Sequence, residues 1–391
     1  MNSAPRILVL FGSGVIFGQE RGNVRAMQAL QERGCSVFCL VREEAWARKS
    51  IDPYLIESNI EFAPAPFLQN NVAGARVSFY VFNILRFIRS YFSFTYYCKK
   101  FQPTHVHVGN PLHFLSFFTS LIGSDLVLIY RIGDKPNVHN PFWGWLWRRI
   151  VDRVDHFVAN SEFIARELEK LDVSRSRITV IYSAPPSRAW PPQPDRQPEH
   201  PQHFLFIGQL TADKGVARLI DAFRLVALEF PDARLTVVGR ISDWSGDNWA
   251  RALRDATHSD STISGRVHFP GEIENIYDYL AAAAFLVVPS VWEEPLANVV
   301  SEAKAAARPS VIFPRGGLPE LIHHGEDGFV CRDTSVEALA EGLRYYLVDP
   351  DLTRSHGRAA IQSLGRLGID KFAARWRDVY DRTTPNRRGR K

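Results

Sequence analysis

Strand-like apolar runs alternate with helical patterns along most of this 391-residue chain, and a proline-rich segment interrupts the alternation once. Short apolar strands separated by helices are typical of parallel sheets that are covered on both faces. Residues 185–202 hold seven prolines in eighteen positions, which favours a stiff linker over a regular element. The alternation then starts again. The pattern therefore predicts two α/β domains, each with its own parallel sheet, and a cleft between them.

The periodicity also predicts individual elements. In the first half we expect strands at Arg6 to Phe11, Ser36 to Val41, His105 to Val108, Leu126 to Ile132, His156 to Ala159 and Ile178 to Tyr182, and helices at Asn23 to Arg33, Pro141 to Arg153 and Glu162 to Leu171. In the second half we expect strands at Phe204 to Ile207, Arg234 to Val238, Arg266 to Phe269, Phe285 to Val288 and Ser310 to Phe313, and helices at Val216 to Phe230, Leu296 to Ala307, Leu318 to His323 and Val336 to Leu347. Asp349 to Asp351 is predicted to be a turn.

Composition excludes several protein classes. The chain is 46% hydrophobic and 23% charged, which rules out disorder, a collagen-like fibre and a coiled coil. Its net charge of +5 is below that of a dedicated DNA-binding protein, so nucleic acid is not an expected partner. The apolar run Ile7 to Phe11 is too short for a signal peptide, and the cysteines form no CxxC pairs. We therefore expect a cytoplasmic protein.

A glycine loop follows the first expected strand. Gly12, Gly14 and Gly18 have a spacing at which backbone amides can approach a phosphate. We interpret this loop, together with His107, as a phosphate or acceptor site. A tight turn is the alternative. A dinucleotide site is less favoured, because the second strand is followed by Arg42 rather than by an acidic residue.

The second half carries a similar turn and two spaced acids. Lys214 precedes Gly215 at a predicted helix N-terminus, where the free amides favour an anion such as a diphosphate. Glu294 lies in a predicted loop, and Glu302 lies in the second turn of the helix that follows. These acids could face one ligand, one beside a sugar and one beside a ribose. The alternative is that these residues bind no ligand, so that Lys214 is an exposed loop lysine and the two glutamates are ordinary surface charges.

The order of these motifs resembles glycosyltransferase family 4, the group 1 glycosyltransferases, which have the two-domain GT-B architecture. The resemblance covers nearly the whole chain and is most specific from Phe204 to Val330. It rests on the F-x-G-x-L-x-x-x-K-G loop, Val237-Val-Gly239, Val267-His-Phe-Pro-Gly271, the E-P-x(6)-E pair and Gly316-Gly-Leu-Pro-Glu320. It implies two Rossmann-like domains: an acceptor-binding domain at 1–184, joined by a C-terminal helix at about 370–391, and a sugar-nucleotide-binding domain at 203–369.

The resemblance also implies an activity and a set of site residues. The activity is retaining transfer of a sugar from a nucleotide-diphosphate sugar to a glycan or lipid-linked hydroxyl acceptor, with no cofactor and no metal. Glu302 would bind the donor ribose, Glu294 the sugar hydroxyls and Lys214 the leaving diphosphate, and Asp134 would accept the acceptor proton. The implied donor-binding residues are Gly208, Gln209, Lys214, Gly239, Arg240, Ile273, Glu294, Leu296, Ala297, Asn298 and Glu302. For Asp134, a turn-capping role is the alternative.

Three positions depart from the family pattern. Gln209 replaces a usual arginine, Gly133 replaces a usual histidine, and Ser183-Ala184 replaces Asn-Gly. These departures keep a second function open, a catalytically impaired relative that binds sugar nucleotides. The Gly12 loop alone keeps a third open, a dinucleotide-dependent oxidoreductase.

Residues 76–101 combine many aromatic rings with five basic and no acidic side chains. Three interpretations are open: rings that pack into the core, a helix that lies on an anionic membrane surface, and a nucleic-acid contact. A second aromatic and basic stretch at Phe142 to Arg149 favours the membrane. A membrane contact would place the protein at the inner face of the cytoplasmic membrane, near a lipid-linked acceptor.

Overall fold

A computed structural model describes residues 4–16, 18–69, 77–184, 198, 200–240, 248–273, 275–368 and 371–383. The chain divides into two compact units: unit 1 comprises Met1–Ser183 with Lys371–Lys391, and unit 2 comprises Ala184–Asp370. The segment predicted to be a linker, residues 185–202, lies for the most part outside the described residues.

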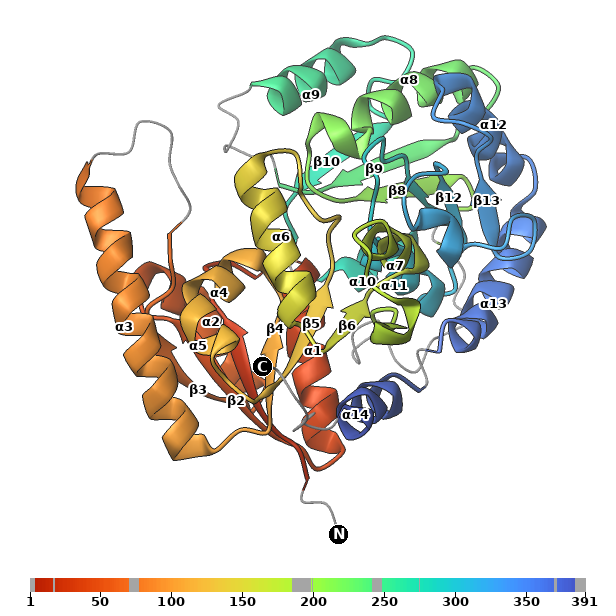
Figure 1. The fold of residues 1–391 in the computed structure, drawn as a ribbon. Coiled ribbons are helices and arrows are strands. Elements are labelled where there is room, and N and C mark those ends of the chain that lie inside the picture. Colours follow the sequence, from red (N-terminus) through yellow and green to blue (C-terminus); the bar gives the residue numbers. More distant parts are fainter. Residues whose placement is uncertain are drawn as a thin grey trace. The chain divides into compact units, whose positions relative to one another are not determined.

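The described residues of unit 1 form a seven-stranded parallel sheet in the order β3-β2-β1-β4-β5-β6-β7 (Figure 1). Its strands are β1 (Arg6–Phe11), β2 (Ser36–Arg42), β3 (Glu61–Ala65), β4 (His105–Val108), β5 (Val127–Ile132), β6 (His156–Ala159) and β7 (Ile178–Val180). Every residue of β4 and β5 is buried, as expected for strands covered on both faces. The strand order reverses between β1 and β4, the point at which such sheets bind ligands beyond their carboxyl ends.

Helices cover this sheet. They are α1 (Gly18–Glu32), α2 (Ala45–Glu57), α3 (Val77–Phe101), α4 (Pro111–Ser116), α5 (Phe118–Ile122), α6 (Pro141–Arg153), α7 (Glu162–Glu169) and α14 (Phe372–Arg382), with the short turn η1 (Arg175–Arg177). Although α14 comes from the far end of the chain, it packs against α1 (Figure 1). Its Trp376 and Tyr380 are buried in the same core cluster as Ile7 and Val9 of β1.

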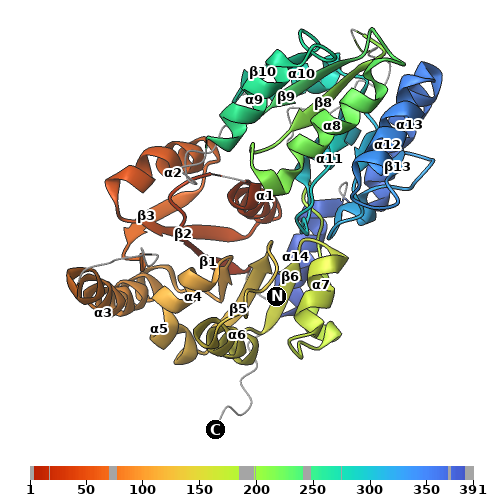
Figure 2. The same ribbon diagram turned by 90° about the horizontal axis from the view of Figure 1, so that it is seen from above.

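The described residues of unit 2 form a six-stranded parallel sheet in the order β10-β9-β8-β11-β12-β13. Its strands are β8 (His203–Ile207), β9 (Arg234–Val238), β10 (Val267–Gly271), β11 (Phe285–Val288), β12 (Ser310–Ile312) and β13 (Gly328–Val330). Its helices are α8 (Val216–Ala227), α9 (Trp249–Ser259), α10 (Ile276–Ala282), α11 (Asn298–Ala305), α12 (Val336–Leu347) and α13 (Pro350–Arg366), with the short turns η3 (Ala212–Lys214) and η5 (Leu318–Leu321). Helix α8 packs against α12, and α11 packs against α13 (Figure 2).

The predicted pair of parallel-sheet α/β domains is confirmed. Several predicted bounds differ from the observed ones, as for α1, which begins at Gly18 and not at Asn23, and two predictions of the element type are wrong. The helix expected over Leu318 to His323 is only the short turn η5. The turn expected at Asp349 is the start of α13, because the Asp349 side chain accepts hydrogen bonds from the amides of Asp351 and Leu352 and Pro350 opens the first turn. Asp and Pro are equally common in turns and at helix starts. Here the residues that follow, among them Ala360 and Leu364, bury one face of a helix, so the segment is helical.

The aromatic region folds into α3, and the core interpretation is wrong for five of its ten rings. Phe94 is buried, whereas Tyr80, Phe82, Tyr91, Phe92 and Tyr96 are exposed. Within the part of the chain that is described, no helix combines the length and the apolar character needed to cross a bilayer.

Candidate functional site

Lys214 ends the short turn η3 that links β8 to α8. The next residue, Gly215, is the N-cap of α8 and has a φ of +75°, in the left-handed region that favours glycine. A Cβ at Gly215 would lie 1.8 Å from the carbonyl oxygen of Pro289, which follows β11. Glycine therefore lets the two loops touch, and this contact sets Lys214 beside the residues that follow β11.

Glu294 lies in the loop after β11 and forms an ion pair with Lys214 through its Oε1 atom. The hydroxyl of Ser290 donates a hydrogen bond to the same oxygen at 2.9 Å. The Glu294 side chain is buried, and a buried carboxylate is stable only where cations and hydrogen bonds replace water. The sequence does not single out Ser290, because a serine at the end of a strand carries no distinctive signal.

The glycine turn after β12 holds the backbone of Glu294. The amide of Gly317 donates to the Glu294 carbonyl oxygen at 2.7 Å. Gly316 has a φ of +59°, and a Cβ there would lie 2.2 Å from that same oxygen. Next to this turn, Arg315 Nε donates to the Val291 carbonyl oxygen at 3.0 Å. A cationic side chain thus lies on the loop that carries Glu294.

Glycines also bring the ends of β8, β9 and β10 close together. The amide of Gly208 donates to the Val238 carbonyl oxygen at 3.0 Å. The amide of Gly239 donates to the Gly271 carbonyl oxygen at 2.9 Å. A Cβ at Gly239 would lie 1.8 Å from the Gly208 carbonyl oxygen, so a larger residue would part these strands. The backbone here is closely packed at the carboxyl edge of the sheet.

Three predicted donor residues lie at this edge with different exposures. Gln209 is exposed, and its carbonyl oxygen accepts a hydrogen bond from the Thr211 amide. Arg240 Nε lies 3.3 Å from a carboxylate oxygen of Glu272, and both side chains are more than half exposed. Ile273 is half-buried. The cation of Arg240 is therefore on the surface of this edge.

Helix α11 begins in the same region. Its N-cap is Ala297, whose side chain cannot accept a hydrogen bond from the first-turn amides. Asn298 is the first helical residue, Leu296 precedes the cap and is buried, and Glu302 lies buried in the second turn. The predicted start of this helix at Leu296 is two residues too early.

A buried ion pair anchors α11 farther along. Lys304 Nζ lies 2.7 Å from Asp327 Oδ2 and 2.6 Å from Ser363 Oγ, and both charged side chains are almost completely buried. Burial alone would raise the pKa of Asp327, but the Lys304 ammonium more than offsets this and holds the pKa below its usual value. The pair connects α11 to the segment before β13 and to α13, so it fixes the helix that carries Glu302.

Unit 1 has a pocket of about 230 Å³ beyond the carboxyl ends of β4 and β5. At the wall of this pocket, Gln19 Nε2 donates a hydrogen bond to the Gly109 carbonyl oxygen at 2.6 Å. The Gly133 carbonyl oxygen accepts a hydrogen bond from Asn160 Nδ2 at 3.2 Å. The side chain of Asp134 is exposed at this pocket. The full lining is Gln19, Gly109, Asn110, Pro111, Leu112, Tyr130, Ile132, Gly133, Asp134, Lys135, Asn137, Trp143 and Trp147.

Several lining residues are absent from the sequence predictions. Trp143 and Trp147 reach the pocket from α6, in the stretch that the sequence analysis attributes to a membrane contact. Asn110 follows β4 and caps α4, its side chain accepting a hydrogen bond from the Leu112 amide at 2.8 Å. A polar residue directly after a buried strand was the available signal for Asn110.

The glycine loop of unit 1 has a packing explanation. A Cβ at Gly12 would lie 2.2 Å from the buried ring of Phe67, and one at Gly14 would lie 2.2 Å from the ring of Trp46. Gly18 is the first residue of α1. Arg42 Nε donates to the Gly12 carbonyl oxygen at 2.8 Å, so a basic side chain occupies the end of β2. Close packing against the buried Phe67 ring, without any phosphate, is thus sufficient reason for Gly12.

His107 lies in strand β4 and not in a loop, which corrects its grouping with the glycine loop. Its Nδ1 lies 2.6 Å from the hydroxyl of Tyr380 in α14, and its ring contacts that of Trp376. Burial, with a contribution from Arg131, lowers the pKa of His107 to about 3. The imidazole is a neutral core group.

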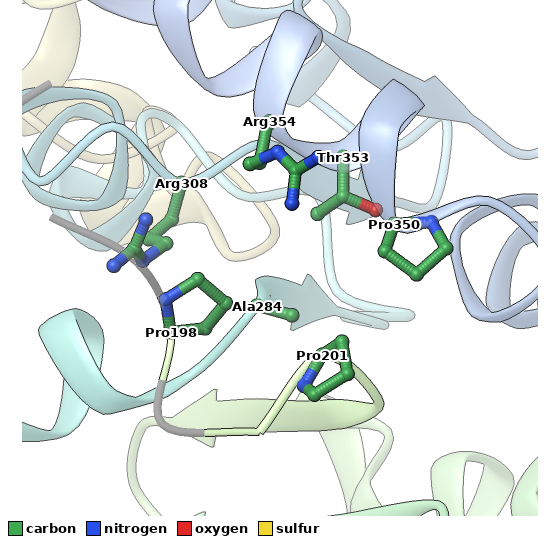
Figure 3. A pocket seen from close by; sticks show the side chains of 7 residues that line it. All are labelled: Pro198, Pro201, Ala284, Arg308, Pro350, Thr353 and Arg354. Carbon is green, nitrogen blue, oxygen red and sulfur yellow. The ribbon is translucent and has the colours of Figure 1, made fainter. Parts of the chain in front are cut away.

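Figure 3 shows a further pocket, of about 200 Å³, in unit 2. Ala284 and Arg308 precede β11 and β12, so this pocket lies at the edge where the strands begin, opposite the Lys214–Glu294 pair. The guanidinium of Arg308 donates to the carbonyl oxygens of Leu280 and Ala281 at 3.0 and 2.8 Å. The Arg308 side chain thus satisfies two carbonyl oxygens at the end of α10.

Within the described ranges, no three His, Cys, Asp or Glu side chains come together as a metal-ligand set. The structure brings the predicted donor residues of unit 2 to one edge of one sheet, and it places Asp134 separately in unit 1.

Two family models match the chain. One, described as "Glycosyl transferases group 1", matches residues 201–349, and the other, described as "Glycosyltransferase Family 4", matches residues 16–184. Together these ranges span most of the chain.

Individual proteins also match. A glycogen synthase of Mycobacterium tuberculosis is 32% identical over 196 residues, covering 48% of this chain and 44% of the relative. An N-acetyl-alpha-D-glucosaminyl L-malate synthase of Bacillus anthracis is 24% identical over 274 residues, covering 68% of each. The structure of Anabaena HepE in complex with UDP has a TM-score of 0.80 at 16% identity, covering 97% of this chain and 100% of that chain, which shows a shared fold. The chain spans about half the length of the first curated relatives it matches.

Proposed function

The chain belongs to the group 1 glycosyltransferases, and we propose that it transfers a sugar from a nucleotide-diphosphate sugar to a hydroxyl acceptor in glycan biosynthesis. In this reaction the bond from the anomeric carbon to the diphosphate breaks, the acceptor oxygen bonds to that carbon, and the acceptor proton leaves. We propose retention of the anomeric configuration and no requirement for a cofactor or a metal. Unit 2 would bind the donor and unit 1 the acceptor.

The observation that carries the proposal is the Lys214–Glu294 ion pair beside the start of α11. A nucleotide sugar joins a diphosphate directly to a polyhydroxylated ring, so its site needs a cation next to a hydrogen-bond acceptor. Lys214 supplies positive charge for the departing diphosphate, and Glu294 accepts hydrogen bonds from sugar hydroxyls. Preorganised charge of this kind is usually the largest contribution to catalysis.

The remaining donor contacts follow from the same edge of the sheet. The amides at Ala297 and Asn298 lie at the N-terminus of α11, where the helix dipole favours an anion, so they suit the diphosphate oxygens. Glu302 lies one turn farther along and would bind the ribose hydroxyls. The closely packed backbone around Gly208, Gly239 and Ile273 would contact the base. HepE, which was solved with UDP, supports a nucleoside diphosphate in this fold.

The acceptor is proposed to bind in the unit 1 pocket. Trp143 is half-buried at the pocket and offers a ring suited to the apolar face of a sugar, and Asp134 is an exposed carboxylate that can take the proton of the acceptor hydroxyl. A glycan or a lipid-linked sugar would fit this chemistry. We place the reaction in the cytoplasm, at the inner face of the membrane when the acceptor is lipid-linked.

Gln209 favours a second candidate, a relative that binds sugar nucleotides without transferring sugar. Its exposed side chain carries no charge at the position where the family usually has arginine. Gln209→Arg distinguishes the two candidates. For an active transferase, the added cation should lower the donor KM about tenfold or more, because a charge-assisted hydrogen bond contributes about 1.5–3 kcal/mol. For a binding protein, the variant should bind the nucleotide more tightly and still release no product.

The test of the proposed function begins with thermal unfolding of the full chain in UDP, GDP, ADP and their sugar conjugates, with NADPH and FAD as controls. A ligand at about 100 times its Kd should stabilise the protein by about 2.7 kcal/mol. Stabilisation by one nucleoside diphosphate, followed by its release from the sugar conjugate in an acceptor screen, supports transfer. Stabilisation by NADPH or FAD alone would contradict it.

A further inference from the structure

Helix α3 attaches to unit 1 through apolar contacts near its C-terminal end, where Phe94 is buried in the core, and through polar groups in its middle. Arg86 is buried, and its NH1 atom donates to Glu44 Oε1 at 2.6 Å and to the Phe67 carbonyl oxygen at 2.8 Å. Ser90 is also buried and donates to the Ser116 carbonyl oxygen. The inward face of this helix therefore combines a buried, hydrogen-bonded charge with the apolar contacts that a surface helix ordinarily makes.

The outward face has the opposite character. Nine large apolar or aromatic side chains of α3 are between 45% and 66% exposed: Tyr80, Val81, Phe82, Ile84, Leu85, Ile88, Tyr91, Phe92 and Tyr96. Most of them recur at spacings of three and four residues, so they form one continuous stripe. Helix α3 is 25 residues long, which corresponds to roughly 37 Å. Figures 1 and 2 show it along the outside of unit 1, next to α5. Such a long apolar stripe on a surface marks an interaction site.

The charges on α3 have one sign. Arg89, Lys99 and Lys100 are exposed, and the helix contains no acidic residue. Arg89 pairs with Glu43 at 3.0 Å, while the two lysines lie in the last turn. In a dimer through this face, the second copy would bring further lysines and arginines from α3. It would bring no carboxylate from α3 to balance these positive charges. The complementary partner is an apolar surface with negative charge at its border.

We infer that the outward face of α3 binds the surface of an anionic lipid bilayer, with the apolar stripe among the acyl chains and the lysines at the headgroups. A helix that is apolar on one side and basic at its edge lies in the membrane interface instead of crossing it. The aromatic side chains suit that interface, because their rings are apolar while tyrosine hydroxyls reach water. This surface is independent of the proposed sugar transfer, and its test needs no donor.

The experiment is flotation of the full chain with vesicles of phosphatidylcholine alone and of phosphatidylcholine mixed with phosphatidylglycerol. We expect the protein to float with the mixed vesicles. Leu85→Glu should reduce this binding at least tenfold, because a carboxylate would enter the apolar layer. The matched control is Leu228→Glu in unit 2, where the leucine is 85% exposed, and it should float like the wild type. The double variant Lys99→Gln, Lys100→Gln should bind the mixed vesicles about 25-fold more weakly than the wild type, because each lost positive charge lowers the affinity about fivefold.

Failure of the wild type to float with either kind of vesicle would overturn the inference, as would equal binding to the uncharged vesicles. A dimer that Leu85→Glu dissociates, without vesicle binding, would instead assign the face to a second copy. Circular dichroism and melting temperature check that Leu85→Glu folds. If it does not, Phe92→Ser replaces it, since Phe92 is 66% exposed. Donor turnover by a protein that does not float would leave the transferase proposal intact and reject this one.

Discussion

Lys214 and Glu294 are 80 positions apart in the chain, and their side chains form an ion pair at the carboxyl edge of the unit 2 sheet. The pair is partly buried, and Ser290 completes the environment of the carboxylate. Each charge therefore depends on the other for its orientation, and a change at either residue should affect both binding and stability.

Lys214→Gln should lower kcat/KM for the donor about 10-fold to 100-fold. The reason is the loss of a charge-assisted hydrogen bond to the diphosphate, worth about 1.5–3 kcal/mol. The melting temperature should also fall, because the variant leaves the Glu294 carboxylate buried without its cation. Steady-state kinetics with calorimetry checks both effects. Lys49→Gln, at an exposed lysine of α2 in unit 1, is the matched control and should change neither.

Glu294→Gln and Glu302→Gln should have different kinetic signatures. Glu294 lies beside Lys214, where charge develops, so its variant should mainly lower kcat. Glu302 lies in the second turn of α11 and is proposed to bind the ribose, so its variant should mainly raise the donor KM. Glu337→Gln, at an exposed position of α12, serves as the control. The reverse pattern of kcat and KM effects would contradict the assigned roles.

Asp134→Asn should lower kcat about 100-fold or more, which is the usual contribution of a general base. Because Asp134 belongs to unit 1, stabilisation of the protein by the donor nucleotide should stay the same. Its carboxylate favours the charged form of the buried Arg131 guanidinium, so the melting temperature should fall slightly. Asp152→Asn in α6, at a 66% exposed aspartate, controls for charge. Full activity of Asp134→Asn would assign this residue to the turn alone.

Unit 1 should lose stability in mild acid because of two core histidines. Burial lowers the pKa values of His107 and His113 from 6.5 to about 3. The unfolded chain therefore binds protons first, so stability is complete above about pH 6.5 and is lost as the pH falls toward 3. Each histidine should contribute a loss of about 2 kcal/mol between about pH 7 and pH 5.

Urea unfolding at these two pH values measures the loss. His107→Asn keeps a polar group toward Tyr380 but does not titrate in this range, so it should remove about half of the pH dependence that the two histidines cause. An unchanged pH dependence in His107→Asn would show that His107 gains its proton without unfolding.

Much of the fold follows from local patterns. Strands β1, β4, β6, β9 and β11 and helices α6 and α12 have the predicted bounds, because each is a short buried run or an amphipathic segment with a clear cap. The elements not predicted, among them α2, β3 and α13, have weaker signals. Helix α2 contains Pro53, and β3 contains Pro64, which the sequence alone would place outside regular structure.

The sequence by itself determined the two α/β domains, the glycine turns and the order of motifs, since these depend on the period of apolar residues and on backbone freedom at single positions. Only the tertiary structure decided which side chains meet. It paired Lys214 with Glu294, buried His107 beneath α14, filled the space beside Gly12 with Phe67, and turned the apolar face of α3 outward. Such contacts join residues far apart in the chain, and their geometry depends on strand order and packing, which no local pattern encodes.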